Sequence, residues 1–367
     1  MDSEEKQIHV MFLPYLAPGH MMPMVDMARL LAGNGLKVTI ITTTMNATLF
    51  KNAIDRDIKS GRQISLATLR FPSIGAGLPE GCENLSSTTT PEMTLKLFHG
   101  IELLQPHIKM ILQKHRPDCI ASDYLFPWTV DVAIELGIPR LAFNGSGFFN
   151  LCVANSIDCH RPHNNVTSET EQFVIPGLPD KVTITRSQLP DIVKGENEVF
   201  SALFDKLKEA ERKSFGVLMN SFYELEPAYA DHFRKVTGIK SRHSFIWAVG
   251  KILKSDNEDN NLDRQQDWWL PEEYEDRLKN RVPVGNETWK VWANEESPLI
   301  NRDKIEKAVR IVMGDTDEAI EMRKQASRLA EFAKMTIEEG GSSSNDLKAL
   351  IEDIRTYKHA TGRGESR

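Results

Sequence analysis

Hydrophobic and polar positions in the first third of the chain follow the pattern of a strand, a helix and a second strand. Residues 8–16 form an apolar run that stops at Pro18-Gly19, which is typical of a strand buried on both faces of a parallel sheet. The next apolar positions recur at the spacing of one buried helical face: Met24, Met27, Ala28 and Leu31. Gly33-Asn34-Gly35 supplies a helix stop, and 37–44 predicts the second strand. The pattern therefore predicts a β-α-β unit.

The same alternation continues to about residue 240. The predicted elements are a helix interrupted by Pro106 (97–115), a strand (117–123), a helix (126–136), a strand (139–144), a helix (147–158), a helix (198–213), a strand (215–222) and a helix (224–237). Residues 160–190 are rich in Pro, Asn, Ser and Thr, which predicts a long surface excursion. Strands that alternate with helices specify a doubly wound parallel sheet, so we expect an N-terminal α/β domain over 1–240.

The remainder, 241–367, is less regular. An apolar run predicts a strand at 243–250, 254–267 is polar and charged, and 268–280 has a helical pattern. Three further helices are predicted, at 302–313, 317–339 and 345–357. A single strand cannot build a sheet of its own, so the pattern predicts an incomplete second domain.

His20 lies where the predicted first strand turns into its helix. This is the carboxyl end of a strand, where open α/β sheets bind ligands. The partly positive helix N-terminus disfavours imidazolium, so we expect a neutral histidine that can accept a proton. From the residues alone, a histidine that only caps or packs at the turn is the favoured alternative.

Composition and net charge indicate which kinds of molecule the chain could bind. The chain has a hydrophobic fraction of 40%, a charged fraction of 26% and a net charge of −7, which indicates a globular protein and argues against nucleic-acid binding. No apolar stretch reaches the ~18 residues of a membrane span, and no secretory signal is visible, so we expect a cytoplasmic monomer that binds small molecules. The four cysteines are scattered, and Cys152, Cys159, His160 and His163 lack the spacing of a zinc site.

Several blocks of the sequence, in this order, resemble the plant UDP-sugar-dependent glycosyltransferases of small molecules, which have the two-domain GT-B fold. The blocks are FLPYLAPGHMMPMVDMARLLA, PDCIASDYLFPWTVDVAIELGIPRLAFNGSGFF, FVIPGLP, GVLMNSFYELEPAYADHFRK, HSFIWAV, WLPEEYEDR, VPVG and GGSSSNDLKALIEDI. The resemblance covers nearly the whole chain. It implies transfer of a sugar, expected to be glucose, from a UDP-sugar to a hydroxyl group of a plant secondary metabolite such as a flavonoid or triterpenoid.

The resemblance also implies roles for individual residues. His20 is expected to be the general base, and Asp123, at the end of the 117–123 strand, its orienting carboxylate. Attack opposite the departing UDP would invert the anomeric carbon. Gly19 and Ser146 are expected to contact the acceptor or the sugar, and Ser146 is equally suited to a helix cap. No cofactor or metal is expected, because UDP-sugar is a co-substrate.

The sequence departs from this family in its donor motif. The family's motif opens with Trp-Ala-Pro-Gln and continues through His-Cys-Gly-Trp-Asn-Ser, and neither string occurs in the chain. It would fall where Asn280 is followed directly by Arg281, and a second gap is expected at Lys240-Ser241. We therefore expect a truncated, Rossmann-like C-terminal domain without the residues that hold UDP.

Three hypotheses follow from different classes. The first is a UDP-glycosyltransferase, and the second is a non-catalytic acceptor-binding remnant that cannot hold UDP-sugar. The third, a nicotinamide oxidoreductase, is disfavoured because the first turn lacks the GxGxxG sequence and the 37–44 strand does not end in an acidic residue.

Overall fold

The computed structural model describes residues 7–189, 194, 198–239, 241–243 and 302–361. Apart from His243, the predicted strand at 243–250 lies outside the described residues. So do the predicted helix at 268–280 and the junction between Asn280 and Arg281.

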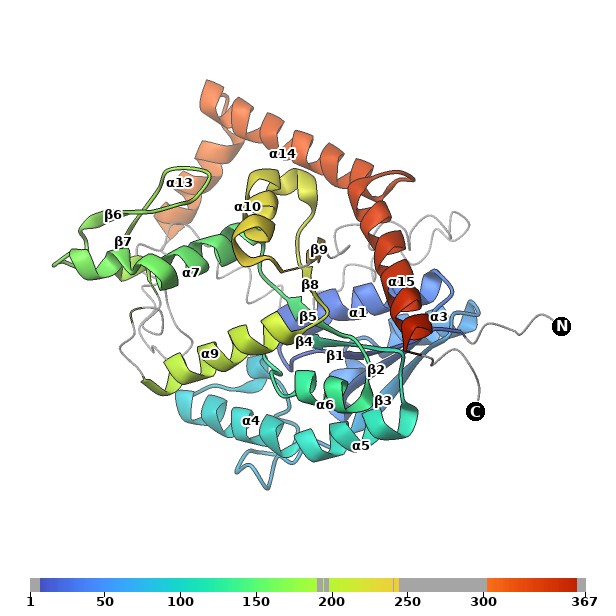
Figure 1. Ribbon diagram of the computed structural model, residues 1–367. Helices are drawn as coiled ribbons and strands as arrows, with labels where there is room; N and C mark the ends of the chain where they lie inside the picture. Colours follow the sequence, from blue (N-terminus) through green and yellow to red (C-terminus); the bar gives the residue numbers. More distant parts are fainter. Residues whose placement is uncertain (1–6, 190–193, 195–197, 240, 244–301, 362–367) are drawn as a thin grey trace.

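A seven-stranded parallel sheet forms the centre of the molecule, with the strand order β3-β2-β1-β4-β5-β8-β9 (Figure 1). Its strands are β1 (His9–Leu13), β2 (Lys37–Thr43), β3 (Ile64–Leu69), β4 (Cys119–Asp123), β5 (Arg140–Asn144), β8 (Gly216–Met219) and β9 (Ser241–His243). A separate antiparallel hairpin pairs β6 (Gln172–Ile175) with β7 (Val182–Thr185). The expected doubly wound parallel sheet is therefore present, and it takes in β9, just beyond residue 240.

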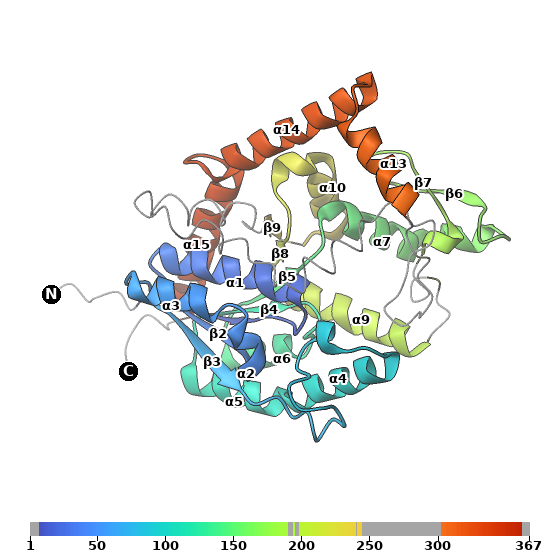
Figure 2. The same ribbon diagram turned by 180° about the vertical axis from the view of Figure 1, so that it is seen from behind.

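Helices connect and cover the strands, as Figures 1 and 2 show from opposite sides. Those preceding β9 are α1 (Pro18–Gly33), α2 (Thr44–Thr48), α3 (Lys51–Lys59), α4 (Pro91–Leu103), α5 (Gln105–His115), α6 (Thr129–Leu136), α7 (Phe148–His160), α9 (Glu198–Lys213) and α10 (Pro227–Thr237). Those near the C-terminus are α13 (Arg302–Met313), α14 (Asp317–Ile337) and α15 (Ser342–Ala360). No helix among the described residues has the length and apolar character that a bilayer span requires.

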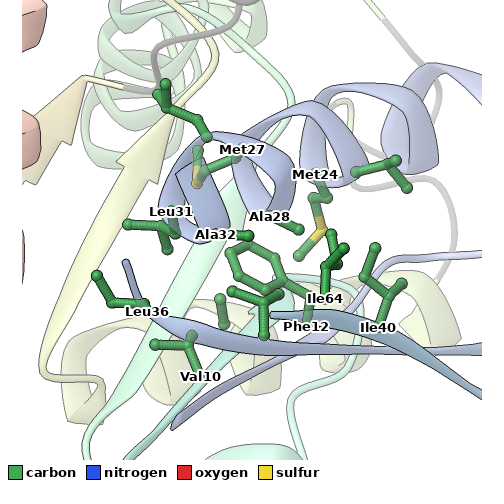
Figure 3. Packing of buried hydrophobic residues seen from close by; sticks show 14 of the residues in the cluster. Val10, Phe12, Met24, Met27, Ala28, Leu31, Ala32, Leu36, Ile40 and Ile64 are labelled. Carbon is green, nitrogen blue, oxygen red and sulfur yellow. The ribbon is translucent and has the colours of Figure 1, made fainter. Parts of the chain in front are cut away.

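Helix α1 packs on one face of the sheet through the apolar stripe that the sequence predicts. Figure 3 shows this stripe above the strands, with Met24 and Ala28 close to Phe12 and Ile40. Each of these four side chains is at most 1% exposed. The opposite face is covered by apolar residues of α4, α5 and α6, which share a cluster with Met11 of β1. Burial on both faces explains the continuous apolar runs of the strands.

Helix α15 returns to the first sheet from the far end of the sequence. Its Leu347, Leu350 and Ile354 belong to the same buried cluster as α1. Lys358 of α15 donates to an Asp118 carboxylate oxygen at 3.2 Å, and the Lys358 side chain is only 5% exposed. The final helix therefore packs on the sheet formed by the N-terminal part of the chain. The domain boundary at 240/241 stays a prediction.

Two parts of the fold were not predicted. Strand β3 and the preceding helix α3 lie at the edge of the sheet, beside β2. The 160–190 excursion contains the β6–β7 hairpin rather than irregular chain alone. Both strands of that hairpin and the edge strand β3 are four to six residues long and only partly buried, so their hydrophobic pattern is weak.

Candidate active site

The strand order brings two of the predicted site residues together. Running outward from the centre, the strand order reverses between β1 and β4, which pair in parallel with Leu13 opposite Ser122. His20 follows β1, and Asp123 is the last residue of β4. The reversal point at the carboxyl ends of the strands is where open α/β sheets form a ligand crevice. His20 and Asp123 therefore lie at the position that this fold favours for binding.

The first turn of α1 places His20. Ala17 is extended at the N-cap, and Pro18, whose fixed φ suits a helix start, occupies the first helical turn. The His20 main-chain N–H donates to the Ala17 carbonyl at 2.9 Å. No side chain caps this end of α1. The His20 ring consequently projects from the first turn, and its side chain is 24% exposed.

A short hydrogen bond joins the two residues. His20 Nδ1 lies 2.7 Å from Asp123 Oδ2, and the Asp123 side chain is fully buried. The other carboxylate oxygen, Oδ1, accepts from the Leu125 main-chain N–H at 3.0 Å. A carboxylate only accepts, so the bond fixes the proton on Nδ1 and leaves the lone pair of the neutral ring on Nε2.

The electrostatics of His20 differ from the expectation based on the helix terminus. Burial lowers the pKa of His20, but the hydrogen bond to Asp123 and the charge of that carboxylate raise it more. The net pKa lies above the ordinary 6.5. The expectation that the helix N-terminus makes imidazolium less favourable at His20 was therefore wrong in direction, because a carboxylate in direct contact outweighs the partial charge of a helix end.

Two tyrosines flank the His20 ring. The Tyr15 ring centre is 5.8 Å from that of His20, and the Tyr124 ring lies nearly parallel to it at 6.4 Å. Burial raises the pKa of Tyr124 to about 12 and that of Tyr15 further. Both phenols are thus neutral near pH 7. Among the groups that contact the ring, the charged partner is Asp123.

Gly19 and Ser146 occupy different surroundings. Gly19 is exposed in the first turn of α1, and a Cβ atom placed there would have no atom within 4 Å beyond its chain neighbours and the adjacent helix backbone. Ser146 is half-buried in the loop between β5 and α7, and its main-chain N–H donates to Asn144 Oδ1 at 3.0 Å. The preceding Gly145 lies beside the ring, because a Cβ atom there would be 3.9 Å from His20 Nδ1. This places the β5–α7 loop next to His20.

The sequence did not point to Glu226, which organises the same loop. Its two carboxylate oxygens accept from the main-chain N–H groups of Phe148 and Phe149, both at 2.7 Å, and one also accepts from the Ser221 hydroxyl. Glu226 therefore caps the N-terminus of α7 from a distance of 78 residues in sequence. A carboxylate immediately before Pro227 is typical of the start of its own helix, so no local signal reveals this contact.

The remaining groups that could carry chemistry lie elsewhere. Cys152 is buried in α7 and Cys159 is exposed near its end. Within the described part of the chain, no three His, Cys, Asp or Glu side chains converge as metal ligands. A groove of about 400 Å³ beside α10 includes none of the four predicted site residues, and its lining is Phe149, Asp180, Leu225, Glu226, Pro227, Ala228 and Tyr229.

Comparison with known proteins decides the family. No protein-family model matches the chain. It is, however, 32% identical to UDP-glucose flavonoid 3-O-glucosyltransferase 7 of Fragaria ananassa over 488 aligned positions, which cover 95% of this chain and 96% of the relative. The chain belongs to the plant UDP-glycosyltransferases. It is also 32% identical to nuatigenin 3-beta-glucosyltransferase of Solanum aculeatissimum, with coverage of 98% and 100%.

Solved structures agree with this plant UDP-glycosyltransferase assignment. Glycyrrhiza uralensis UGT73P12, complexed with glycyrrhetinic acid 3-O-monoglucuronide, superposes with a TM-score of 0.83 at 29% identity, covering 98% of each chain. Medicago truncatula UGT71G1, complexed with UDP-glucose, shares the fold with a TM-score of 0.63 at 16% identity, over 96% of this chain and 100% of that one. The GT-B assignment, the enzyme class and the expected UDP-sugar co-substrate are thereby confirmed at the level of the family.

Proposed function

We propose that the chain carries the acceptor side of a UDP-glycosyltransferase, which moves a sugar to a hydroxyl group of a small molecule. The observation that supports this most directly is the 2.7 Å contact between His20 and Asp123 at the reversal point of the sheet. A hydroxyl group is a poor nucleophile at neutral pH, and a base oriented by a third group overcomes this. The Nε2 atom of His20, whose Nδ1 is held by Asp123, has the free lone pair that such a base needs.

The reaction would proceed as an inverting displacement. Nε2 of His20 takes the proton of the acceptor hydroxyl while the acceptor oxygen forms a bond to the anomeric carbon. The bond from that carbon to the UDP oxygen breaks, and UDP leaves with the electron pair on the opposite face. Asp123 holds the ring in one orientation and stabilises the imidazolium that forms. General-base assistance of this kind typically contributes ~10²–10⁴-fold to the rate.

The relatives narrow the substrates that we propose. Their names specify glucose transfer to a flavonoid in one case and to nuatigenin in another. We infer that this chain's acceptor is a hydroxylated plant secondary metabolite such as a flavonoid or triterpenoid, and that its sugar is glucose. Gly19 and Ser146 are proposed to contact the acceptor or sugar. This is supported by the open space beside Gly19 and by the position of Ser146 directly after Gly145, which lies next to His20.

A second candidate function is acceptor binding without sugar transfer. It is favoured by the lack of the Trp-Ala-Pro-Gln and His-Cys-Gly-Trp strings in the sequence. The 488 aligned positions also exceed the 367 residues of the chain, so at least 121 positions of that alignment have no residue here. A pyrophosphate needs a helix N-terminus with free N–H groups, and the family's motif supplies one. Without it, the base would have an acceptor but no donor sugar.

One experiment separates the two functions. The full chain is incubated with UDP-glucose and a panel of flavonoid and triterpenoid acceptors, and glycoside formation is followed by mass spectrometry together with UDP release. Glycoside that disappears in the His20→Ala variant supports transfer. Saturable acceptor binding in a parallel fluorescence titration, without any glycoside, supports the second function. If the chain forms no glycoside and binds no acceptor, both functions are contradicted.

A further inference from the structure

Arg140, the first residue of β5, is the largest fully buried side chain among the described residues. It is only 2% exposed, and burial lowers the pKa of its guanidinium to about 10, so the group remains charged near pH 7. Removing a charge from water costs several kcal/mol unless its N–H groups are all used. A buried arginine in this position therefore requires a set of matched acceptors.

Six acceptors surround the Arg140 guanidinium, and all are neutral oxygens. They are Ser122 Oγ (2.9 Å), Thr129 Oγ1 (2.8 Å), the carbonyl oxygens of Asp123 (3.2 Å), Phe126 (3.4 Å) and Ala210 (3.4 Å), and Ser214 Oγ (2.7 Å). Ala210 and Ser214 lie at the end of α9. The other four all belong to the turn at 122–129. Most of the Arg140 hydrogen bonds therefore go to this one turn.

That turn carries the Asp123 carboxylate. The main-chain carbonyl of Asp123 accepts from Arg140, and the side-chain carboxylate of the same residue contacts His20. The turn is also closed internally, since the Ser122 and Thr129 hydroxyls lie 2.8 Å apart and the Leu125 N–H donates to Asp123 Oδ1. Arg140 spans both ends of this closed unit, so its planar fork fixes where the carboxylate stands.

The charges around this unit are few. Arg140 interacts at longer range with Asp123 and with Glu211 of α9, and both carboxylates favour its charged form. Burial raises the pKa of Glu211, which also shares a hydrogen bond with Asn144. On the other side, His20 faces Asp123 and the neutral phenols of Tyr15 and Tyr124. The position of Asp123 therefore controls how strongly His20 holds its proton.

We propose that Arg140 is a positioning residue for the proposed base. Through its hydrogen bonds to the 122–129 turn, it holds the Asp123 carboxylate in contact with His20. The proposal rests on the proposed function only for its relevance to sugar transfer. The effect on His20 is a property of the folded chain and is measurable without UDP-sugar or acceptor.

The test follows the titration of His20 by NMR in the full chain with ¹³C-labelled histidine, using His20→Gln to identify the signal. Arg140→Lys keeps a cation but loses the fork, so the turn loosens and Asp123 supports the imidazolium less. We expect the pKa of His20 to fall by at least about 0.5, because the weakened carboxylate contact raises the pKa less while burial lowers it as before. An unchanged or raised pKa in a folded Arg140→Lys protein overturns the proposal.

A matched pair of milder variants covers the case in which Arg140→Lys does not fold. Thr129→Val removes one acceptor on the turn, whereas Ser214→Ala removes one directly after α9. We expect the pKa of His20 to fall in Thr129→Val and to stay within about 0.1 of the parent in Ser214→Ala. Equal shifts in the two variants contradict positioning through the turn. A chain that forms no glycoside but shows these shifts refutes only the proposed transfer activity.

Discussion

Glu226 offers a test of how the loop beside His20 is held. Glu226→Ala removes the acceptor for two main-chain N–H groups at the start of α7. A hydrogen bond to a charged group contributes about 1.5–3 kcal/mol, and the one from Phe148 is partly buried. The one from Phe149 is exposed, so water replaces most of it and we count only about 0.5 kcal/mol. The expected loss of unfolding free energy is about 2–3.5 kcal/mol.

Urea unfolding followed by circular dichroism measures this loss. Glu135→Ala serves as the control, because Glu135 forms an exposed ion pair with Lys109 and its removal should leave the midpoint unchanged within error. Gly147 provides a second arm, since a Cβ atom there would lie 2.6 Å from Glu226 Oε1 and must displace the carboxylate. Gly147→Ala should therefore be costly alone and nearly free in the Glu226→Ala background. Additive losses, or a loss below about 1 kcal/mol for Glu226→Ala, would refute the capping role.

Four further predictions concern His20, Asp123 and the donor sugar. In a chain with the family's donor motif restored, His20→Ala should lower turnover at least ~10²-fold with UDP affinity unchanged, and Asp123→Asn should lower turnover less. The rate of UDP release measures turnover in both variants. Unchanged turnover in His20→Ala would contradict the assignment of His20 as the base. Because the pKa of His20 is raised above 6.5 and the base must be neutral, kcat/KM should fall as pH drops through that raised pKa, and Asp123→Asn should move this limb to lower pH. By the same linkage, His20 contributes stability that is present below pH 6.5 and lost as pH rises through its folded-state pKa, so a stability profile without this decline would contradict the shift. The 367-residue chain itself should bind UDP-glucose with a Kd above about 1 mM, which corresponds to a binding free energy of less than ~4 kcal/mol. A micromolar Kd measured by calorimetry would show that a donor site exists.

The hydrophobic pattern predicted the central elements of the fold because those elements are buried on one continuous stripe or on both faces. The helix that became α1 ends at Gly33, as its Gly-Asn-Gly stop predicts. Strand β3 was not predicted, because its six residues lie at the sheet edge and only Ile64 is fully buried. An edge strand needs only one apolar face, so its sequence differs little from that of a loop.

The site was predictable in part. The alternation of strands and helices places His20 after one strand and Asp123 at the end of another, at the same edge of a parallel sheet. It does not specify that β1 and β4 are neighbours, because strand order depends on packing between segments whose paired residues are 109 positions apart. Their pairing came from the resemblance to the family. Arg140 and Glu226 gave no signal, since each acts through contacts that only the folded chain brings together.

The docking of α15 has a consequence for how this protein is made. The core beneath α1 is completed by Leu350 and Ile354, and Lys358 meets Asp118 across 240 residues of sequence. At about 5–20 residues per second, a ribosome needs roughly 10–50 s to make that stretch. During this interval the sheet surface that α15 covers stays exposed to water and to other chains. If translation stops before the last helix, that surface stays exposed permanently. We therefore expect the growing chain to need chaperones and prematurely terminated products to be degraded.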